Sequence, residues 1–408
     1  MTNFATSLVF FAEVLAAATL FRLAVPRLPA AVRPALLIGS SLLFLGQLEA
    51  HPAFLLATAA YAAVAAGAAA AIGRVPRLKA DALAVSGAIL LAVFVLLLVK
   101  YRYYSSLLLG GMAALPGLSG FEWLGLSYMT FRAIDLTVQA KRGREAPSPL
   151  AAAAFLLFFP AYLAGPINRF QDFVRDLGGP LPVLGADDYR DIALRLAGGV
   201  VKVLLLAEVF RANSLIGVGS TEGMGPAAIL AGLYCQFAYI YFDFSGYSDV
   251  AIAVARLFGI RLPENFNFPF LSRNLQDFWN RWHITFAQWC RDYIYFVLLR
   301  WFRLKARWLS DVGANLAAIF VTFFFMGAWH GDGLNWLLYG LYHGAGMSAL
   351  VVGRRAVPPE LSDRLSASSA FRALSVATTV TFVSLGLLLT HNLPFAREAA
   401  GQLLGLGR

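Results

Sequence analysis

His330 is the side chain in this sequence that is best suited to acid–base chemistry. It stands in the stretch GAWHGDG (327–333), next to Trp329 and within a run of large apolar residues. An imidazole has an unperturbed pKa of about 6.5, which suits proton transfer near neutrality. The three glycines of the stretch remove side-chain bulk, so we expect them to leave room for a substrate chain, with Trp329 and Trp336 as flat walls. The pattern predicts a general base at His330; a hydrogen-bonded core histidine is the alternative.

Motifs for other kinds of catalysis are missing from the sequence. It contains no GxSxG, HExxH or GxxxxGK[ST] pattern, and its two cysteines, Cys235 and Cys290, do not form a CxxC pair. Serine hydrolases, zinc peptidases and P-loop nucleotidases are therefore not supported, and no metal site is predicted. What remains is a histidine that takes a proton from a hydroxyl. That chemistry suits direct transfer of an acyl group from an activated donor to an alcohol, without a covalent enzyme intermediate.

A second candidate group lies in residues 271–300, LSRNLQDFWNRWHITFAQWCRDYIYFVLLR. Its large apolar residues recur every three or four positions, which predicts one helix with an aromatic stripe. Asp277 and Arg281 lie off the stripe at i,i+4 and can form an ion pair. A helix this charged is expected at the membrane interface or along a polar cavity. His283 lies at the edge of the stripe, and the residues expected to line the cavity with it are Asn280, Arg281 and Trp282.

Four further polar positions fall in the apolar segment 238–260, at Asp243, Ser245, Ser248 and Asp249. They form either the polar wall of a cavity or a buried carboxylate satisfied by hydroxyls and helix-end amides. His343 lies thirteen residues after His330, about 20 Å along a continuous helix. We expect it to be structural unless the chain breaks between the two histidines, and His51 and His391 near segment ends are expected to be structural as well.

The composition places these residues in a membrane. Of the 408 residues, 59% are hydrophobic and 14% are charged, whereas soluble chains are about 25% charged. Apolar windows near the length of about 20 residues that a spanning helix needs recur along the whole chain. The sequence therefore predicts an all-α polytopic membrane protein with roughly ten or eleven transmembrane helices, together with re-entrant or interfacial helices.

The positive charge follows the same pattern. The formal net charge is +10, but the basic residues stand between apolar windows, as in 22–33 and 74–79. This distribution is typical of the excess of Lys and Arg in cytoplasmic loops. We therefore expect contact with membrane lipids and no nucleic-acid partner. The alternation places the N-terminus outside the cell and the loops at 22–33 and 73–81 in the cytoplasm, and it gives no clear topology beyond residue 100.

At these residues the sequence resembles the membrane-bound O-acyltransferase family. The matching stretches are LGLSYMTFRAIDL (124–136), FFPAYLAGPINRF (158–170), the block 241–295 and FMGAWHG (325–331). PFLSRNLQDFWNRWHI and YGLYHG resemble the D-alanyl transferases of teichoic acid (DltB type). YFDFSGYSD and PENFNFP resemble the alginate and polysaccharide O-acetyltransferases (AlgI type). The stretch 296–307 departs from the acetyl pattern, so the D-alanyl branch is favoured.

The resemblance implies a ring of helices around a central tunnel, in one membrane domain of a bacterial inner membrane. Residues 1–122 would be N-terminal helices, 123–350 the core with the motifs, and 351–408 a C-terminal loop and helix. His330 would be the catalytic base and His283 the second histidine of the site. The implied donor is an acyl thioester on a phosphopantetheinyl carrier protein or coenzyme A, with no bound cofactor. The implied acceptor is a polymer of the cell envelope, and a periplasmic acyl-transfer partner is a further candidate.

Two other classes of function stay open on the sequence alone. A transporter of an activated acyl or glycan precursor could use the histidines to relay protons, although no inverted repeat is evident. A scaffold without activity is the third reading. The basic residues Arg281, Arg291 and Arg300 to Arg307 would meet either an acidic carrier protein or lipid headgroups.

Overall fold

The structure, a computed structural model, describes residues 8–48, 53–100, 123–143 and 146–406. Within these ranges every regular element is helical, and the predicted all-α class is confirmed. His51 and the first seven residues lie outside the described residues. The helices gather into two compact units, Met1–Leu204 with Gly246–Pro263 and Leu205–Ser245 with Glu264–Arg408. The long helix α13 (Pro226–Leu257) contributes its first part to the second unit and its last part to the first.

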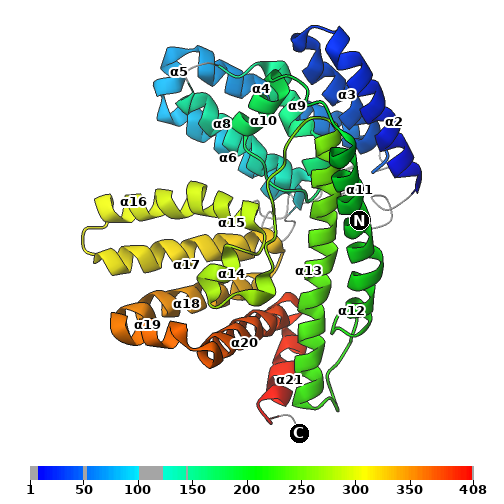
Figure 1. Cartoon of the computed structure of the whole chain (residues 1–408). Coiled ribbons are helices and arrows are strands. Elements are labelled where there is room, and N and C mark those ends of the chain that lie inside the picture. The colour runs from blue at the N-terminus through cyan, green and yellow to red at the C-terminus, as the bar shows by residue number, and fades with distance from the viewer. Residues whose placement is uncertain (1–7, 49–52, 101–122, 144–145, 407–408) are drawn as a thin grey trace. The chain divides into compact units, whose positions relative to one another are not determined.

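The first unit is built from short and medium-length helices (Figure 1). α4 packs against α8 and α9, and α6 runs along α8. Many of these positions are alanines or leucines, which favour helices and allow close packing. The bounds are α2 (Leu8–Ala24), α3 (Arg33–Leu45), α4 (Ala53–Arg74), α5 (Pro76–Ala80), α6 (Ala82–Lys100), α8 (Leu126–Arg142), α9 (Pro149–Leu157), α10 (Phe170–Gly178) and α11 (Ala186–Val201).

The sequence stretches 124–136 and 158–170 are joined by hydrogen bonds in this unit. Arg132 on α8 has no exposed surface; it donates to the carbonyls of Leu156 and Phe155, and its guanidinium lies 4.5 Å from the centre of the Phe155 ring. Asp135, one turn further on and equally buried, accepts from the backbone N–H of Phe170 at 2.7 Å. Both charged groups are buried and form hydrogen bonds with the backbone, which offset part of the cost of burial. The stretches 124–136 and 158–170 therefore form a structural joint of the first unit.

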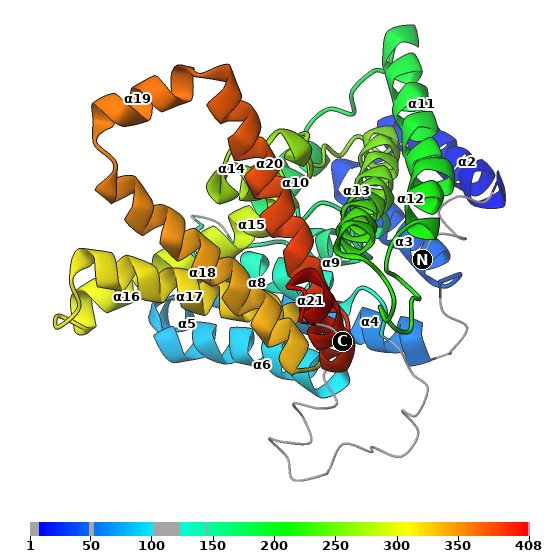
Figure 2. The same ribbon diagram turned by 90° about the horizontal axis from the view of Figure 1, so that it is seen from below.

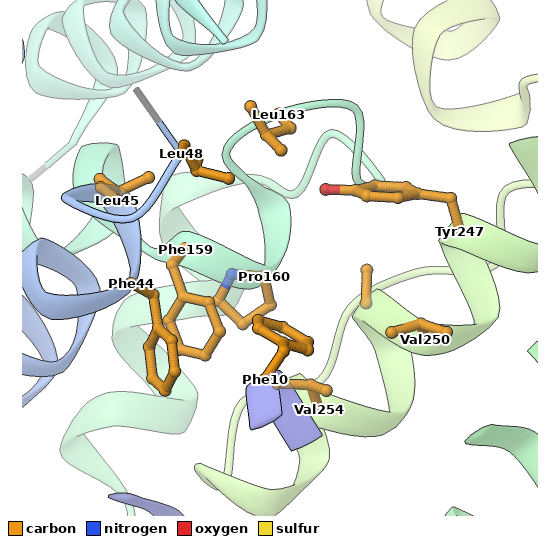
Figure 3. A pocket seen from close by; sticks show the side chains of 11 residues that line it. Phe10, Phe44, Leu45, Leu48, Phe159, Pro160, Leu163, Tyr247, Val250 and Val254 are labelled. Atoms are coloured by element: carbon orange, nitrogen blue, oxygen red, sulfur yellow. The ribbon is translucent and has the colours of Figure 1, made fainter. Parts of the chain in front are cut away.

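A charged cluster and an apolar cavity lie along the last part of α13. Asp249 accepts from Arg195 at 3.0 Å and from Lys202 at 2.6 Å, which satisfies this carboxylate within an apolar helix. Figure 3 shows the cavity, which is lined almost entirely by apolar side chains, with the Tyr247 hydroxyl as its polar group. Its walls are Phe10, Phe44, Leu45, Leu48, Phe159, Pro160, Leu163, Tyr247, Val250, Ala251 and Val254, all of the first unit.

The second unit contains the predicted site residues. Its helices α17 and α18 form an antiparallel hairpin, and α16 packs along α17 in both views (Figures 1 and 2). The bounds are α12 (Glu208–Ala212), α14 (Leu275–Trp279), α15 (Ile284–Cys290), α16 (Phe296–Lys305), α17 (Asp311–His330), α18 (Leu334–Ala356), α19 (Pro359–Ala367), α20 (Ser369–Gly386) and α21 (Leu393–Leu403). The prediction of a loop at the start of 351–408 is wrong, because α18 continues to Ala356 and α19 follows, with proline in its first turn and Glu360 near its N-terminus.

Five helical segments are long and apolar enough to cross a membrane, by length and composition: Val9–Arg27, Ala53–Arg74, Pro226–Leu257, Asp311–His330 and Ser369–Thr390. Arg33–Leu45 and Ala82–Leu97 are shorter apolar helices. The larger count of ten or eleven spans, the ring around a tunnel and the single-domain division stay predictions.

Candidate active site

His330 is the last residue of α17, at a break in the chain. Gly331 is extended, with φ −165° and ψ 174°, and Gly333 has φ 156°, a conformation that residues with a side chain rarely adopt. α18 then begins at Leu334 and runs back along α17. The chain therefore breaks at Gly331–Gly333, which the sequence left open.

The return of α18 depends on two glycines that face each other. A Cβ atom on Gly327 would lie 2.9 Å from Gly340 Cα and would collide with the Trp336 carbonyl oxygen. A Cβ atom on Gly340 would collide with the carbonyl oxygen of Phe323. The two backbones thus approach as closely as small residues permit.

Aromatic rings enclose the His330 imidazole. The Trp336 ring stacks on it at a centroid distance of 5.7 Å and an angle of 20°, and the Tyr339 ring stands perpendicular to it at 5.7 Å. Trp329 lies 4.7 Å away and Phe286 of α15 lies 6.3 Å away. His330 itself is half-buried, so the imidazole sits in a cage that is not fully closed.

Trp336 occupies space that was expected for a substrate. Its indole lies against the backbone of Gly331, where a Cβ atom would collide with the indole ring. The prediction that these glycines leave room for a substrate chain is wrong at Gly331 and Gly327. The space beside Gly331 is filled by the Trp336 indole, and the space beside Gly327 is filled by the backbone of α18.

His283 lies beside this cage, between α14 and α15. It is 3% exposed, its ring stacks on Phe286 at 4.9 Å, and the Trp329 ring lies 6.3 Å away. Its backbone is left-handed, with φ 43° and ψ 50°. Such a conformation is uncommon for a residue with a side chain and requires support from its surroundings.

Asn265 supplies that support. Its Oδ1 accepts from the hydroxyl of Thr285 at 2.8 Å and from the backbone N–H of Thr285 at 3.3 Å. The same oxygen lies 3.2 Å from His283 Nδ1, so Nδ1 is the donor and the lone pair of the neutral ring is on Nε2. Sequence reasoning missed Asn265; the only signal was a buried amide among the aromatic residues of PENFNFP.

The electrostatics of His283 follow from this burial. His283 lies outside the five candidate spans. Desolvation, and then the nearby charge of His330, lower the pKa of His283 well below its usual value. The ring is therefore neutral at physiological pH, able to accept a proton or a hydrogen bond at Nε2.

The prediction of one helix across 271–300 is wrong. The left-handed residue His283 separates α14 from α15, and a π-helical turn at Arg291–Tyr295 precedes α16. The backbone N–H of Ile284 donates to the Asn265 carbonyl, so a residue eighteen positions upstream takes up the hydrogen bonding at the break. The expected i,i+4 pair is confirmed, with Arg281 Nε 2.7 Å from Asp277 Oδ1.

The other predicted site residues, Asn280, Arg281 and Trp282, make their contacts elsewhere. Asn280 is exposed at the end of α14, and Arg281 also donates to the Asn267 carbonyl at 3.2 Å. Trp282 packs among Phe237, Phe266 and Phe278, at 5.2 to 5.6 Å. Of these predicted site residues, Trp282 therefore contributes to packing and Arg281 to an ion pair.

Asp243 and Ser245 lie on α13, at the end of its second-unit part. Asp243 is half-buried, and the buried Ser245 hydroxyl has no hydrogen-bond partner among the described residues. The residue between them reaches the site instead, since the Phe244 ring lies 4.7 Å from the His283 ring.

Within the ranges that the structure describes, no group of three or more His, Cys, Asp or Glu side chains is arranged to hold a metal ion. Cys235 and Cys290 are not paired with each other.

The helices and this histidine site define a multi-pass, all-α membrane protein. Comparison with known families matches residues 88–359 to the membrane-bound O-acyltransferase family, so this chain belongs to that family.

Individual relatives fall into two groups. The chain is 34% identical over 235 residues to the teichoic acid D-alanyltransferase of Bacillus subtilis, which covers 54% of this chain and 57% of the relative. It is 33% identical over 243 residues to that of Streptococcus thermophilus, covering 55% and 56%. It is 32% identical over 234 residues to the probable alginate O-acetylase AlgI of Pseudomonas aeruginosa, covering 54% and 41%. The matches thus span about half the length of these relatives.

Proposed function

We propose that this chain is a membrane O-acyltransferase that moves a small acyl group, D-alanyl or similar, from a cytoplasmic thioester to a hydroxyl of an extracytoplasmic acceptor. The observation that carries the proposal is the half-buried His330 imidazole, held in an aromatic cage beside His283 inside the segment that matches the family. A caged imidazole is a general base suited to deprotonating an alcohol.

The reaction needs one base and no covalent enzyme intermediate. His330 takes the proton of the acceptor hydroxyl while its oxygen attacks the thioester carbonyl. The new carbon–oxygen bond forms, the carbon–sulfur bond breaks, and the sulfur leaves with its electron pair. The imidazolium of His330 then returns the proton to the departing sulfur. The surrounding aromatic faces favour the transient cation, because a positive charge within about 6 Å of a ring centre is attracted to its π-electrons.

His283 serves beside the reaction centre in this proposal. With Nδ1 donating to Asn265, its Nε2 can accept a hydrogen bond from the acceptor or from the protonated His330. Its rigid, strained backbone is consistent with such a positioning role, since strain is retained where surroundings over-determine a residue.

A phosphopantetheinyl carrier protein is the proposed donor partner, entering from the cytoplasmic side. What supports a protein partner is α16, which exposes Val297, Trp301 and Leu304 beside its basic residues. Acidic carriers would be attracted to Arg300 on this helix and to Arg307 just after its end, and the exposed apolar side chains of the helix would add contact area. Lipid headgroups are the competing partner for these arginines.

The second candidate is O-acetylation of an exported polysaccharide. It is favoured by the similarity to the probable alginate O-acetylases, which share about the same portion of this chain. Both candidates share the remaining features of the proposal. These are a polymer acceptor of the cell envelope, a periplasmic partner, a location in the bacterial inner membrane and an extracytoplasmic N-terminus.

The test uses the full chain in sealed vesicles that carry acceptor polymer, either teichoic acid or alginate, inside. Radiolabelled D-alanyl carrier protein and acetyl-coenzyme A are supplied outside in separate reactions. Label recovered as a base-labile ester on one polymer supports acyl transfer and identifies the branch. Label that accumulates inside as unreacted acyl donor, without ester, would indicate a transporter instead.

A further inference from the structure

α18 presents three ring-bearing residues on the face that meets α17. Trp336, Tyr339 and His343 follow at i, i+3 and i+7, the spacing of one helical face. The Tyr339 ring lies 5.7 Å from the His330 ring and 4.7 Å from the His343 ring. Because the chain breaks after His330 and α18 returns, one tyrosine contacts both histidines.

His343 is a polar residue in an apolar box. It is 1% exposed, and neither ring nitrogen has a hydrogen-bond partner among the described residues. Five rings surround its imidazole within 6.4 Å: Trp279, Phe323, Tyr339, Tyr342 and Phe382. An apolar side chain would fill the same space without the cost of two unpaired polar atoms. Packing alone therefore does not explain a histidine at this position.

A polar group without a partner adjoins it on one side, and a tyrosine on another. The buried Trp279 Nε1 has no partner among the residues that the structure describes, and the Tyr339 ring stands across the imidazole at 4.7 Å. On a third side the end of α20 closes in, since a Cβ atom on Gly386 would lie 3.2 Å from His343 Nε2. Buried polar groups without partners in a native fold call for a bound group or a functional state that satisfies them.

We propose that His343 is a positioning residue for His330, acting through Tyr339. In the substrate-loaded site its ring hydrogen-bonds the Tyr339 hydroxyl and fixes the tyrosine ring against the His330 imidazole. The inference rests on the proposed acyl transfer. His343 takes no proton from the reaction; the proton passes from the acceptor hydroxyl to His330 and then to the leaving sulfur. Its contribution is to hold the ring that faces His330 when the imidazolium forms.

The experiment compares two substitutions of His343. His343→Phe keeps an aromatic ring, one atom larger, and removes both nitrogens, and His343→Gln keeps the ability to hydrogen-bond. Turnover, the KM for the charged carrier protein and the melting temperature in detergent are measured for the full chain. We expect His343→Phe to lower kcat about tenfold, with KM within about twofold and a raised melting temperature. His343→Gln should retain about a third or more of the wild-type kcat.

Tyr339→Phe tests the route. It should lower kcat to the same extent as His343→Phe, and the double variant should lose no more than either single variant, because residues of one unit are non-additive. Unchanged turnover in His343→Phe, or an equal loss in His343→Gln, would overturn the inference. So would a melting temperature that falls together with turnover, because a purely structural role predicts that result.

His330→Ala separates this inference from the function on which it rests. If wild-type protein transfers acyl groups and His330→Ala does not, the proposed function stands whatever His343 does. If His330→Ala transfers at the wild-type rate, the assignment of His330 as the base fails, and the positioning role of His343 fails with it; if the wild-type protein forms no ester, the proposed function itself fails.

Discussion

The indole of Trp336 stacks on the imidazole of His330, with ring centroids 5.7 Å apart and planes inclined by 20°. The backbone of Gly331 lies under that indole, with no room for a Cβ atom between them. The glycine after the histidine thus permits a contact that orients the proposed base.

Gly331→Ala is expected to push Trp336 away from His330 and to lower turnover by about 10- to 100-fold, because a misplaced catalytic group costs rates of that order. Turnover of the purified full chain in detergent is the measurement. Gly353→Ala is the matched control on the same hairpin, since a Cβ atom there meets nothing within 4 Å. Equal turnover in the two variants would contradict the role given to Gly331.

Gly327→Ala should weaken the α17–α18 hairpin. The added methyl would meet Gly340 at 2.9 Å, and overpacking of this kind costs about 1–3 kcal/mol. The melting temperature should fall, whereas Gly67→Ala on α4, where a Cβ atom meets nothing within 4 Å, should leave it unchanged or raise it. A melting temperature unaffected by Gly327→Ala would show that the close approach of α17 and α18 does not contribute to stability.

Asn265→Ala removes the acceptor that holds both His283 and Thr285. It should destabilise the protein by about 1–3 kcal/mol, since buried donors lose their partner. It should also lower turnover, because the His283 ring is no longer fixed. Asn267→Ala is the control: Asn267 is exposed, and its backbone N–H and carbonyl form hydrogen bonds with Arg281. If both variants behave alike, Asn265 does not position the histidine.

The burial of His283 predicts acid sensitivity. The pKa of His283 is held well below its ordinary value in the folded state, whereas the unfolded chain titrates near 6.5. Above about pH 6.5 both states are neutral at this site. Below it the unfolded state binds the extra proton, so stability falls by up to about 1.4 kcal/mol per pH unit. Melting temperatures between pH 7.5 and 5 should show this slope, and His283→Gln should flatten it. Parallel slopes in the two proteins would rule out His283 as the source.

The parts of this site that the sequence predicted are those that depend only on residues close together in the chain. The apolar run that ends at His330 has the length of a span, and α17 covers Asp311–His330. The i,i+4 pair of Asp277 and Arg281 also depends only on helical spacing. A break after His330 was one of two open outcomes, and the extended Gly331 with Gly333 at φ 156° decided it.

The remainder depends on contacts between distant segments. Periodicity across 271–300 could not show that Asn265 would support a left-handed His283 and so end one helix and start another. The proximity of Tyr339 and His343 to His330 could not be predicted either, because it requires α18 to fold back on α17. Space inferred from glycines was misjudged for the same reason, since Trp336 and the α18 backbone fill it.

The most direct test of the central claim is a single-turnover assay of ester formation, with charged carrier protein and polymer acceptor, on wild type and His330→Ala. Both proteins should insert in the membrane at equal levels and melt at similar temperatures. Loss of the general base should reduce the rate of ester formation by about 10²- to 10⁴-fold. Ester formation at the wild-type rate in His330→Ala would contradict the assignment of His330 as the base.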